Sequence, residues 1–110
     1  MSFSFSFSSL VEIQSVIKSD KTTFIDFGAQ WCGPCKQLKP IFYKESKKHK
    51  DCNFLTIDVD DNEDVADYYK ITTVPSVLVF RKGKQIGQQS GYNNEKEFHS
   101  FVVRMIEKKV

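Results

Sequence analysis

The sequence predicts a single α/β domain over residues 1–110, with a central mixed sheet of about five strands flanked by four helices. Segments of strand character alternate with segments of helical period in the order β-α-β-α-β-α-β-β-α. The βαβ units imply parallel central strands, while the short turn before the last strand implies an antiparallel hairpin. A Cys-x-x-Cys pair lies at a strand-to-helix junction in this pattern, which is typical of a redox site.

The N-terminal elements follow from local spacing. Phe and Ser alternate with period two over residues 2–7, which predicts an edge strand; the alternative is a disordered tail. Residues 9–12, Ser-Leu-Val-Glu, match a capping box and predict a helix that continues to Ser19-Asp20. Residues 22–27 are rich in β-branched and aromatic side chains without alternation, so we expect a central strand covered on both faces.

The middle of the chain predicts two helices separated by a strand. The second helix follows the cysteine pair directly, and Pro40 inside it should kink the helix and remove one hydrogen bond. Residues 53–59 form the next strand. The acidic residues at 61–64 suit a helix N-terminus, and they predict a short third helix that ends near Tyr69 and Lys70.

The C-terminal part predicts a hairpin and a final amphipathic helix. A strand over residues 76–80 is followed by a turn at 81–84 and by a partner strand at 85–90. Residues 94–97, Asn-Glu-Lys-Glu, then open a last helix. The apolar stripe of this helix comprises Phe98, Phe101, Val102, Met105 and Ile106.

Composition excludes several classes of protein. A net charge of +2 is too small to indicate nucleic acid or an anionic membrane surface as a partner. No segment approaches the roughly 20 apolar residues of a membrane span. The N-terminus lacks the basic segment and continuous apolar run of a secretory signal. The chain has three cysteines, an odd number that does not suit a secreted domain held together by disulfides. We therefore expect a cytoplasmic location in a reducing compartment.

The pair Cys32 and Cys35 can close into a small disulfide or stand open as a dithiol. If Cys32 caps the following helix, the unpaired N–H groups and the helix dipole lower its pKa and favour the reactive thiolate. We expect Cys32 to be the more exposed thiol, and Cys35, one turn further on, to attack a mixed disulfide formed there. Gly33 and Pro34 fit a tight turn into a helix, where proline costs no backbone hydrogen bond.

One further cysteine and two histidines lie outside this pair. A single Cys-x-x-Cys can also be half of a zinc site, but no second pair stands at ligand spacing, and His49 and His99 are isolated in the sequence. We therefore expect no metal. The sequence favours Cys52 as a small buried hydrophobic residue. Regulatory oxidation, or an intermolecular disulfide that links dimers, is the alternative.

Residues 26–36, Asp-Phe-Gly-Ala-Gln-Trp-Cys-Gly-Pro-Cys-Lys, resemble the thioredoxin family, and essentially the whole chain shares this resemblance. The other matching positions are Pro40, Asp58-Val59-Asp60, Val74-Pro75-Ser76, Gly83 and Gly91. The motif Trp-Cys-Gly-Pro-Cys is specific, because protein disulfide isomerase domains usually carry Gly-His between their cysteines and glutaredoxins carry Pro-Tyr. The resemblance implies a thioredoxin fold in which Cys32 is the attacking thiol, Cys35 the resolving thiol, and Pro75 a cis proline that faces the disulfide.

Asp26 is an aspartate among apolar residues of a predicted central strand, where burial without a partner is costly and should raise its pKa. A carboxyl that titrates near neutrality can relay a proton to or from Cys35, which is also the role that the resemblance implies. The alternative places Asp26 at a solvated strand end without a catalytic role. One departure from the family is Thr56, which stands where bacterial thioredoxins have a lysine partner for this aspartate.

Several residues around the pair are expected to bind substrate. A trans bond is the statistical default before Pro75, since only about 5–6% of X–Pro bonds are cis, but the resemblance implies cis. The Val74 backbone would then pair with an extended substrate segment, and Gly91 would leave room for that segment. Trp31 is expected to shield the thiols and contact substrate, with packing alone as the alternative. The expected substrate-binding residues are Trp31, Gly33, Pro34, Val74, Pro75 and Gly91.

The sequence thus predicts a general protein-disulfide oxidoreductase that reduces substrate disulfides by dithiol-disulfide exchange and contributes to cell redox homeostasis. The resemblance implies that no cofactor is bound and that NADPH acts only indirectly, through a flavin-dependent thioredoxin reductase. The expected partners are this reductase and disulfide-containing proteins. We expect the chain to be a monomer that takes part in electron transport. The alternatives are an oxidase or isomerase of the same fold, and a binding scaffold in which redox activity is incidental.

Overall fold

The computed structural model describes residues 3–6 and 10–109. The predicted order of elements is confirmed over these residues. The strands and helices are β1 (Phe3–Ser6), α1 (Leu10–Ile17), β2 (Thr23–Gly28), α2 (Gly33–Lys48), β3 (Asn53–Asp58), α3 (Glu63–Tyr68), β4 (Ser76–Arg81), β5 (Lys84–Ser90) and α4 (Glu95–Glu107). The predicted capping residue Ser9 lies outside the described residues, as do the ends of the predicted strand at 2–7.

The strands form a five-stranded mixed sheet in the order β1-β3-β2-β4-β5, which confirms the predicted sheet. Strands β1, β3 and β2 are parallel, whereas β4 pairs antiparallel with both β2 and β5. The β1 backbone occupies one edge, as the period-two pattern predicts. Strand β2 lies at the centre, so whatever follows it emerges from the middle of the sheet.

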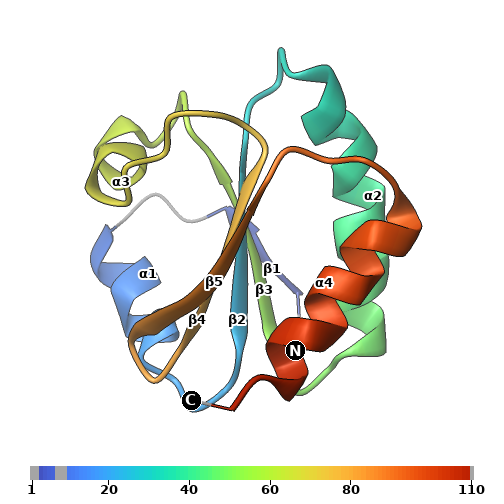
Figure 1. Cartoon of the computed structure of the whole chain (residues 1–110). Helices are drawn as coiled ribbons and strands as arrows, with labels where there is room; N and C mark the ends of the chain where they lie inside the picture. Colours follow the sequence, from blue (N-terminus) through green and yellow to red (C-terminus); the bar gives the residue numbers. More distant parts are fainter. Residues whose placement is uncertain (1–2, 7–9, 110) are drawn as a thin grey trace.

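Helices α1 and α3 lie on one side of the sheet, and α2 and α4 lie on the other (Figure 1). Strand β2 is buried on both faces, as predicted. Phe24 packs in the core beneath α2 and α4, whereas Ile25 and Phe27 pack in the core beneath α1 and α3. Because side chains alternate along a strand, Asp26 shares the face of Phe24 and is directed toward α2.

Local signals account for the turns and caps of the C-terminal half. The Asn94 side chain accepts a hydrogen bond of 2.9 Å from the Glu97 N–H and so caps α4 as predicted. In the β4–β5 hairpin, Lys82 and Gly83 have φ angles of 54° and 83°. Positive φ at both central positions is typical of a type I′ hairpin turn, and only glycine adopts it without steric cost. Helix α2 continues through Pro40, and the kink there stays a prediction.

Arg81 joins the end of β4 to the end of α4. Its guanidinium donates hydrogen bonds to the carbonyl oxygens of Lys108 at 2.6 Å and Met105 at 2.9 Å. Its Nε donates to the Thr22 hydroxyl at 2.9 Å. The last carbonyls of a helix lack intrahelical partners, so this side chain stabilises the end of α4 against the sheet.

We expect Arg81→Met to lower the free energy of unfolding by about 2 kcal/mol, because charge-assisted hydrogen bonds to otherwise unpaired carbonyls are lost. Urea denaturation measures the change. Lys84→Met, at an exposed position of the same hairpin, is the control and should change stability by less than about 0.5 kcal/mol. Equal effects of both substitutions would show that Arg81 does not anchor the helix.

Candidate active site

Cys32 is the N-cap of α2 and forms a disulfide with Cys35, the two Cα atoms being 5.3 Å apart. Its backbone is extended, and its Sγ accepts a hydrogen bond of 3.2 Å from the Cys35 N–H. Gly33 and Pro34 occupy the first helical positions, where the missing N–H of proline costs no helical hydrogen bond. The prediction that Cys32 caps the helix is confirmed.

Both cysteines are buried in the disulfide form, with 5% of Cys32 and 7% of Cys35 exposed. These whole-residue values are nearly equal, so the expectation that Cys32 is the more exposed thiol stays a prediction. The two cysteines are buried because they cluster with Ala29 and because Val59 and Val74 pack against this cluster. These covering residues come from segments far apart in the sequence, so local spacing carries no sign of them.

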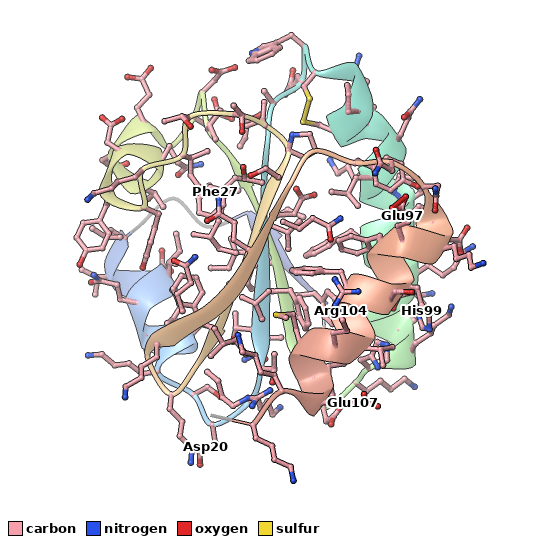
Figure 2. The ribbon with its side chains drawn as sticks, in the orientation of Figure 1. Asp20, Phe27, Glu97, His99, Arg104 and Glu107 are labelled. Carbon is pink, nitrogen blue, oxygen red and sulfur yellow. A yellow bond between two sulfur atoms is a disulfide. The ribbon has the colours of Figure 1, made fainter. Side chains whose placement is uncertain are left out.

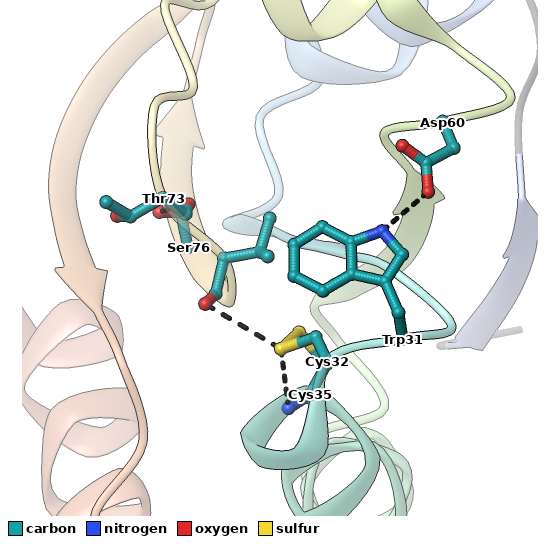
Figure 3. The surroundings of a disulfide bond; sticks show 7 residues. Trp31, Cys32, Cys35, Asp60, Thr73 and Ser76 are labelled. Atoms are coloured by element: carbon teal, nitrogen blue, oxygen red, sulfur yellow. Dashed lines mark hydrogen bonds between the residues drawn. A yellow bond between two sulfur atoms is a disulfide. The ribbon is translucent and has the colours of Figure 1, made fainter.

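The Val74–Pro75 peptide bond is cis, as the resemblance implied. The Val74 carbonyl oxygen lies 3.7 Å from Cys32 Sγ, a contact shown in Figure 3. A disulfide sulfur carries no proton, so this contact becomes a hydrogen bond only when Cys32 is a thiol. The Gly91 N–H donates to the Pro75 carbonyl oxygen at 2.8 Å, and Gly91 has a φ of 80°, which favours glycine. The structure thus brings Val74 to the disulfide and joins Gly91 to Pro75 by a hydrogen bond, while the expectation that Pro75 faces the disulfide stays a prediction.

Trp31 lies on the surface with 70% of its area exposed, so the alternative that it only packs in the core is wrong. Its indole N–H donates a hydrogen bond of 2.8 Å to Asp60 (Figure 3). Asp60 is itself held by its backbone N–H, which donates to the Asp58 carboxylate at 2.8 Å. The sequence placed Asp60 in a matching motif but gave no sign of this contact, because 29 residues separate it from Trp31.

Asp26 is only 6% exposed, which excludes the alternative of a solvated strand end. Its Oδ1 has no hydrogen-bond partner among the described residues. Burial raises the pKa of this carboxyl to about 7, and the positive charge of Lys39 opposes the rise. Thr56 is its neighbour on β3, so the missing lysine of that strand is replaced by a lysine of α2. Lys39 lies four residues after Cys35, and this helical spacing was the one signal that could have revealed it.

Asp26 and Cys35 line the same cleft of about 570 Å³, together with Gly28 and Lys39. A Cβ atom at Gly28 would stand 3.4 Å from both Cβ and Sγ of Cys35, so glycine lets this strand pack closely on the cysteine. The sequence analysis gave Gly28 no role. The cleft thus has both a buried carboxyl and a buried cysteine in its wall.

The thioredoxin family model matches residues 9–104 of the chain. The chain belongs to the thioredoxin family. Thioredoxins from Homo sapiens and Callithrix jacchus are each 46% identical over 77 residues, which is 70% of this chain and 73% of theirs. Among thioredoxin structures, that from Trypanosoma brucei brucei has a TM-score of 0.87 at 23% identity, covering 97% of this chain and 93% of its own. The thioredoxin structure from Fasciola hepatica has a TM-score of 0.84 at 28% identity, and the match covers 96% of this chain and 99% of that one.

Membership in the thioredoxin family and the Cys32–Cys35 pair make this protein a thiol-disulfide oxidoreductase. It reduces disulfides by dithiol-disulfide exchange through this redox-active pair. Thioredoxins have a reductase and disulfide-bearing proteins as partners in general, and their chemistry resides in their own cysteines. None of the helices within the described residues has the length and apolar character needed to cross a membrane.

The prediction for the remaining cysteine is confirmed, whereas the expectation for the two histidines is not. Cys52 is 3% exposed in the core beneath α2 and α4, which confirms it as a small buried hydrophobic residue. Burial, with the negative charge of Asp51, raises the pKa of its thiol to about 11. The expectation that His49 and His99 are isolated is wrong in space, because the fold brings both to the same buried carboxylate, that of Glu45.

We expect Asp26→Asn to stabilise the folded protein increasingly as pH rises from about 4 to about 7. The carboxyl has a pKa of 3.8 in the unfolded chain and about 7 in the folded protein. Within this window the folded state binds more protons, so the parent protein loses up to about 4 kcal/mol of stability as pH increases. Urea denaturation of both proteins across this range measures the difference, and a difference independent of pH would contradict the raised pKa.

Proposed function

We propose that the Cys32 thiolate attacks one sulfur of a substrate disulfide and that Cys35 resolves the product. In the first step a Cys32–substrate bond forms, the substrate disulfide breaks, and the other substrate sulfur leaves as a thiolate. Cys35 then loses its proton and attacks Cys32 Sγ. The substrate leaves as a dithiol, two electrons have passed to it, and the Cys32–Cys35 disulfide has formed.

The hydrogen bond from the Cys35 N–H to Cys32 Sγ supports these roles. It directs a backbone donor at Cys32 from the first turn of α2, where the helix dipole also favours negative charge. Cys35 lies inside the helix and has no equivalent capping position. Once a substrate is bound at Cys32, Cys35 is held beside the bond to be broken, which gives it a high effective concentration.

Asp26 is proposed as the group that accepts the proton of Cys35 and returns it when the pair is reduced. Its place in the same cleft as Cys35 supports a transfer through water. A carboxyl whose pKa is about 7 exists in both protonation states at neutral pH, so it can act in either direction. The positive charge of Lys39, on α2, lowers the pKa of Asp26 and so limits its rise.

The surface around the disulfide is proposed to bind an extended substrate segment. Val74 presents its backbone beside Cys32 Sγ, and backbone pairing gives affinity without strong sequence selectivity. Gly33 and Pro34 are exposed, and a Cβ atom at Gly33 or Gly91 would meet no other described atom within 4 Å. Trp31 is also exposed and Val74 is half-buried, whereas Pro75 is buried and contributes the cis bond that follows Val74.

The wider setting is proposed from the family. A flavin-dependent thioredoxin reductase would restore the dithiol with electrons from NADPH, so that the protein serves electron transport as a carrier without a bound cofactor. We propose that it acts as a monomeric single domain over residues 1–110 in the cytoplasm, with disulfide-containing proteins as substrates. The similarity to thioredoxins across 70% of the chain supports this proposal.

We expect Cys35→Ser to accumulate a mixed disulfide with substrate at Cys32, because the resolving thiol is absent. Non-reducing electrophoresis and mass spectrometry of the reaction with a disulfide-bonded protein detect the adduct. Cys32→Ser should form none at neutral pH. Cys52→Ser is the control and should turn over normally, since its thiol is buried. An adduct that formed at Cys35 instead would reverse the assigned roles.

We expect Asp26→Asn to slow resolution on the order of 10²-fold at neutral pH, because the proton acceptor for Cys35 is lost. In the parent protein the single-turnover rate should rise with pH through about 7, following the Asp26 pKa. Lys39→Met should move this midpoint to higher pH, since the lysine lowers that pKa. Unchanged single-turnover kinetics in Asp26→Asn would remove the proposed proton transfer.

A further inference from the structure

A second cluster of titratable side chains lies between α2 and α4, outside the disulfide site. Its centre is Glu45 of α2, a carboxylate that is fully buried. His49, the C-cap of α2, stands four residues later and so shares its helical face. His99 approaches from α4, which runs alongside α2 (Figure 2). Glu45, His49 and His99 are named here the α2–α4 cluster, and it contains both histidines of the chain.

The donor atoms of the α2–α4 cluster converge on one point. His49 Nε2 lies 3.2 Å from Glu45 Oε1, and His99 Nδ1 lies 3.0 Å and 2.9 Å from the two carboxylate oxygens. One ligand atom from each residue lies within 4.8 Å of the others. Ligand atoms of a tetrahedral zinc ion stand about 3.3 Å apart, given metal–ligand bonds of about 2.0–2.1 Å. The histidine-to-carboxylate separations are therefore close to those around a bound ion, and the separation between the two histidine nitrogens is at most 4.8 Å.

We propose that Glu45, His49 and His99 bind a divalent transition-metal ion of the zinc type and that this ion bridges α2 and α4. Two neutral imidazoles and one carboxylate are a donor set that zinc accepts in sites with a fourth, open position. The exposed fractions of the histidine side chains, 20% for His49 and 44% for His99, leave a path for the ion and room for a water ligand. The positive ion would also compensate the buried charge of Glu45.

The surrounding charges are compatible with this site. Lys48 Nζ lies 3.6 Å from Glu45 Oε2, but the lysine side chain is 47% exposed and can turn into solvent when the ion enters. Lys44 is held by Glu95 at 2.8 Å. The pKa of Glu95 is lowered mainly by its hydrogen bond to Lys44 and, to a smaller extent, by Lys48 and His99.

The α2–α4 cluster is separate from the redox chemistry. Glu45 lies thirteen residues after the Cys32 cap, which corresponds to about 20 Å along a helix. An ion bound there does not contact Cys32 or Cys35. Its effect is to clamp the end of α2 to α4, so we expect it to raise thermal stability without being required for disulfide exchange.

The test is titration of the oxidised protein with Zn²⁺ at pH 7.5, followed by calorimetry and by the ring-proton NMR signals of His49 and His99. The oxidised form is used because the open Cys32–Cys35 dithiol would itself bind zinc. We expect about one equivalent to bind, both histidine signals to shift together, and the melting temperature to rise. Glu45→Gln and His99→Gln should each weaken binding by at least about tenfold.

Glu95→Gln is the matched control, because it removes an exposed carboxylate next to the α2–α4 cluster but no ligand. It should bind zinc like the parent. His99→Gln replaces a partly exposed side chain, so it tests the proposal even if the buried Glu45→Gln variant fails to fold. Equal zinc affinity in His99→Gln and parent would overturn the proposal, as would the absence of histidine shifts at millimolar zinc.

Discussion

The active site depends on one local constraint, the emergence of Cys32 from the central strand β2 directly into the N-cap of α2. The Cys35 N–H can point at Cys32 Sγ only because Cys32 stays extended while Cys35 is already helical. This single geometry places a reactive sulfur at the positive end of a helix and its partner one turn away. The sheet and the flanking helices hold that junction in place.

Burial sets the pKa of Asp26 more strongly than the charges around it do. Asp26 shares a face of β2 with Phe24, so it lies beneath α2 in an apolar layer. Desolvation is the dominant cause of its raised pKa, and the positive charge of Lys39 opposes the rise. The same helix therefore supplies the cysteines and the cation that moderates the carboxyl beneath them. A change in the packing of α2 would alter both together.

Helix α2 also links the redox site to the α2–α4 cluster at its other end. Its N-terminus carries the cysteine pair, whereas its C-terminal turn carries a buried carboxylate between two imidazoles. Between the two ends, Leu38 and Phe42 of α2 pack in the core beneath the helix, where Phe42 lies edge-on against Phe54. The helix thus presents two chemically different sites.

The sequence by itself determined the order of elements, the caps of α2 and α4 and the redox character of the Cys-x-x-Cys junction, because these depend on residues within a few positions of each other. It also indicated that Asp26 is buried, since a charged residue in an apolar strand is conspicuous. Only the tertiary structure decided which groups face one another. Three contacts are of this kind: Val74 covers the disulfide, Lys39 acts on Asp26, and His99 approaches Glu45. Each brings together side chains from separate elements. Such contacts depend on how helices and strands pack, and no local pattern records that packing.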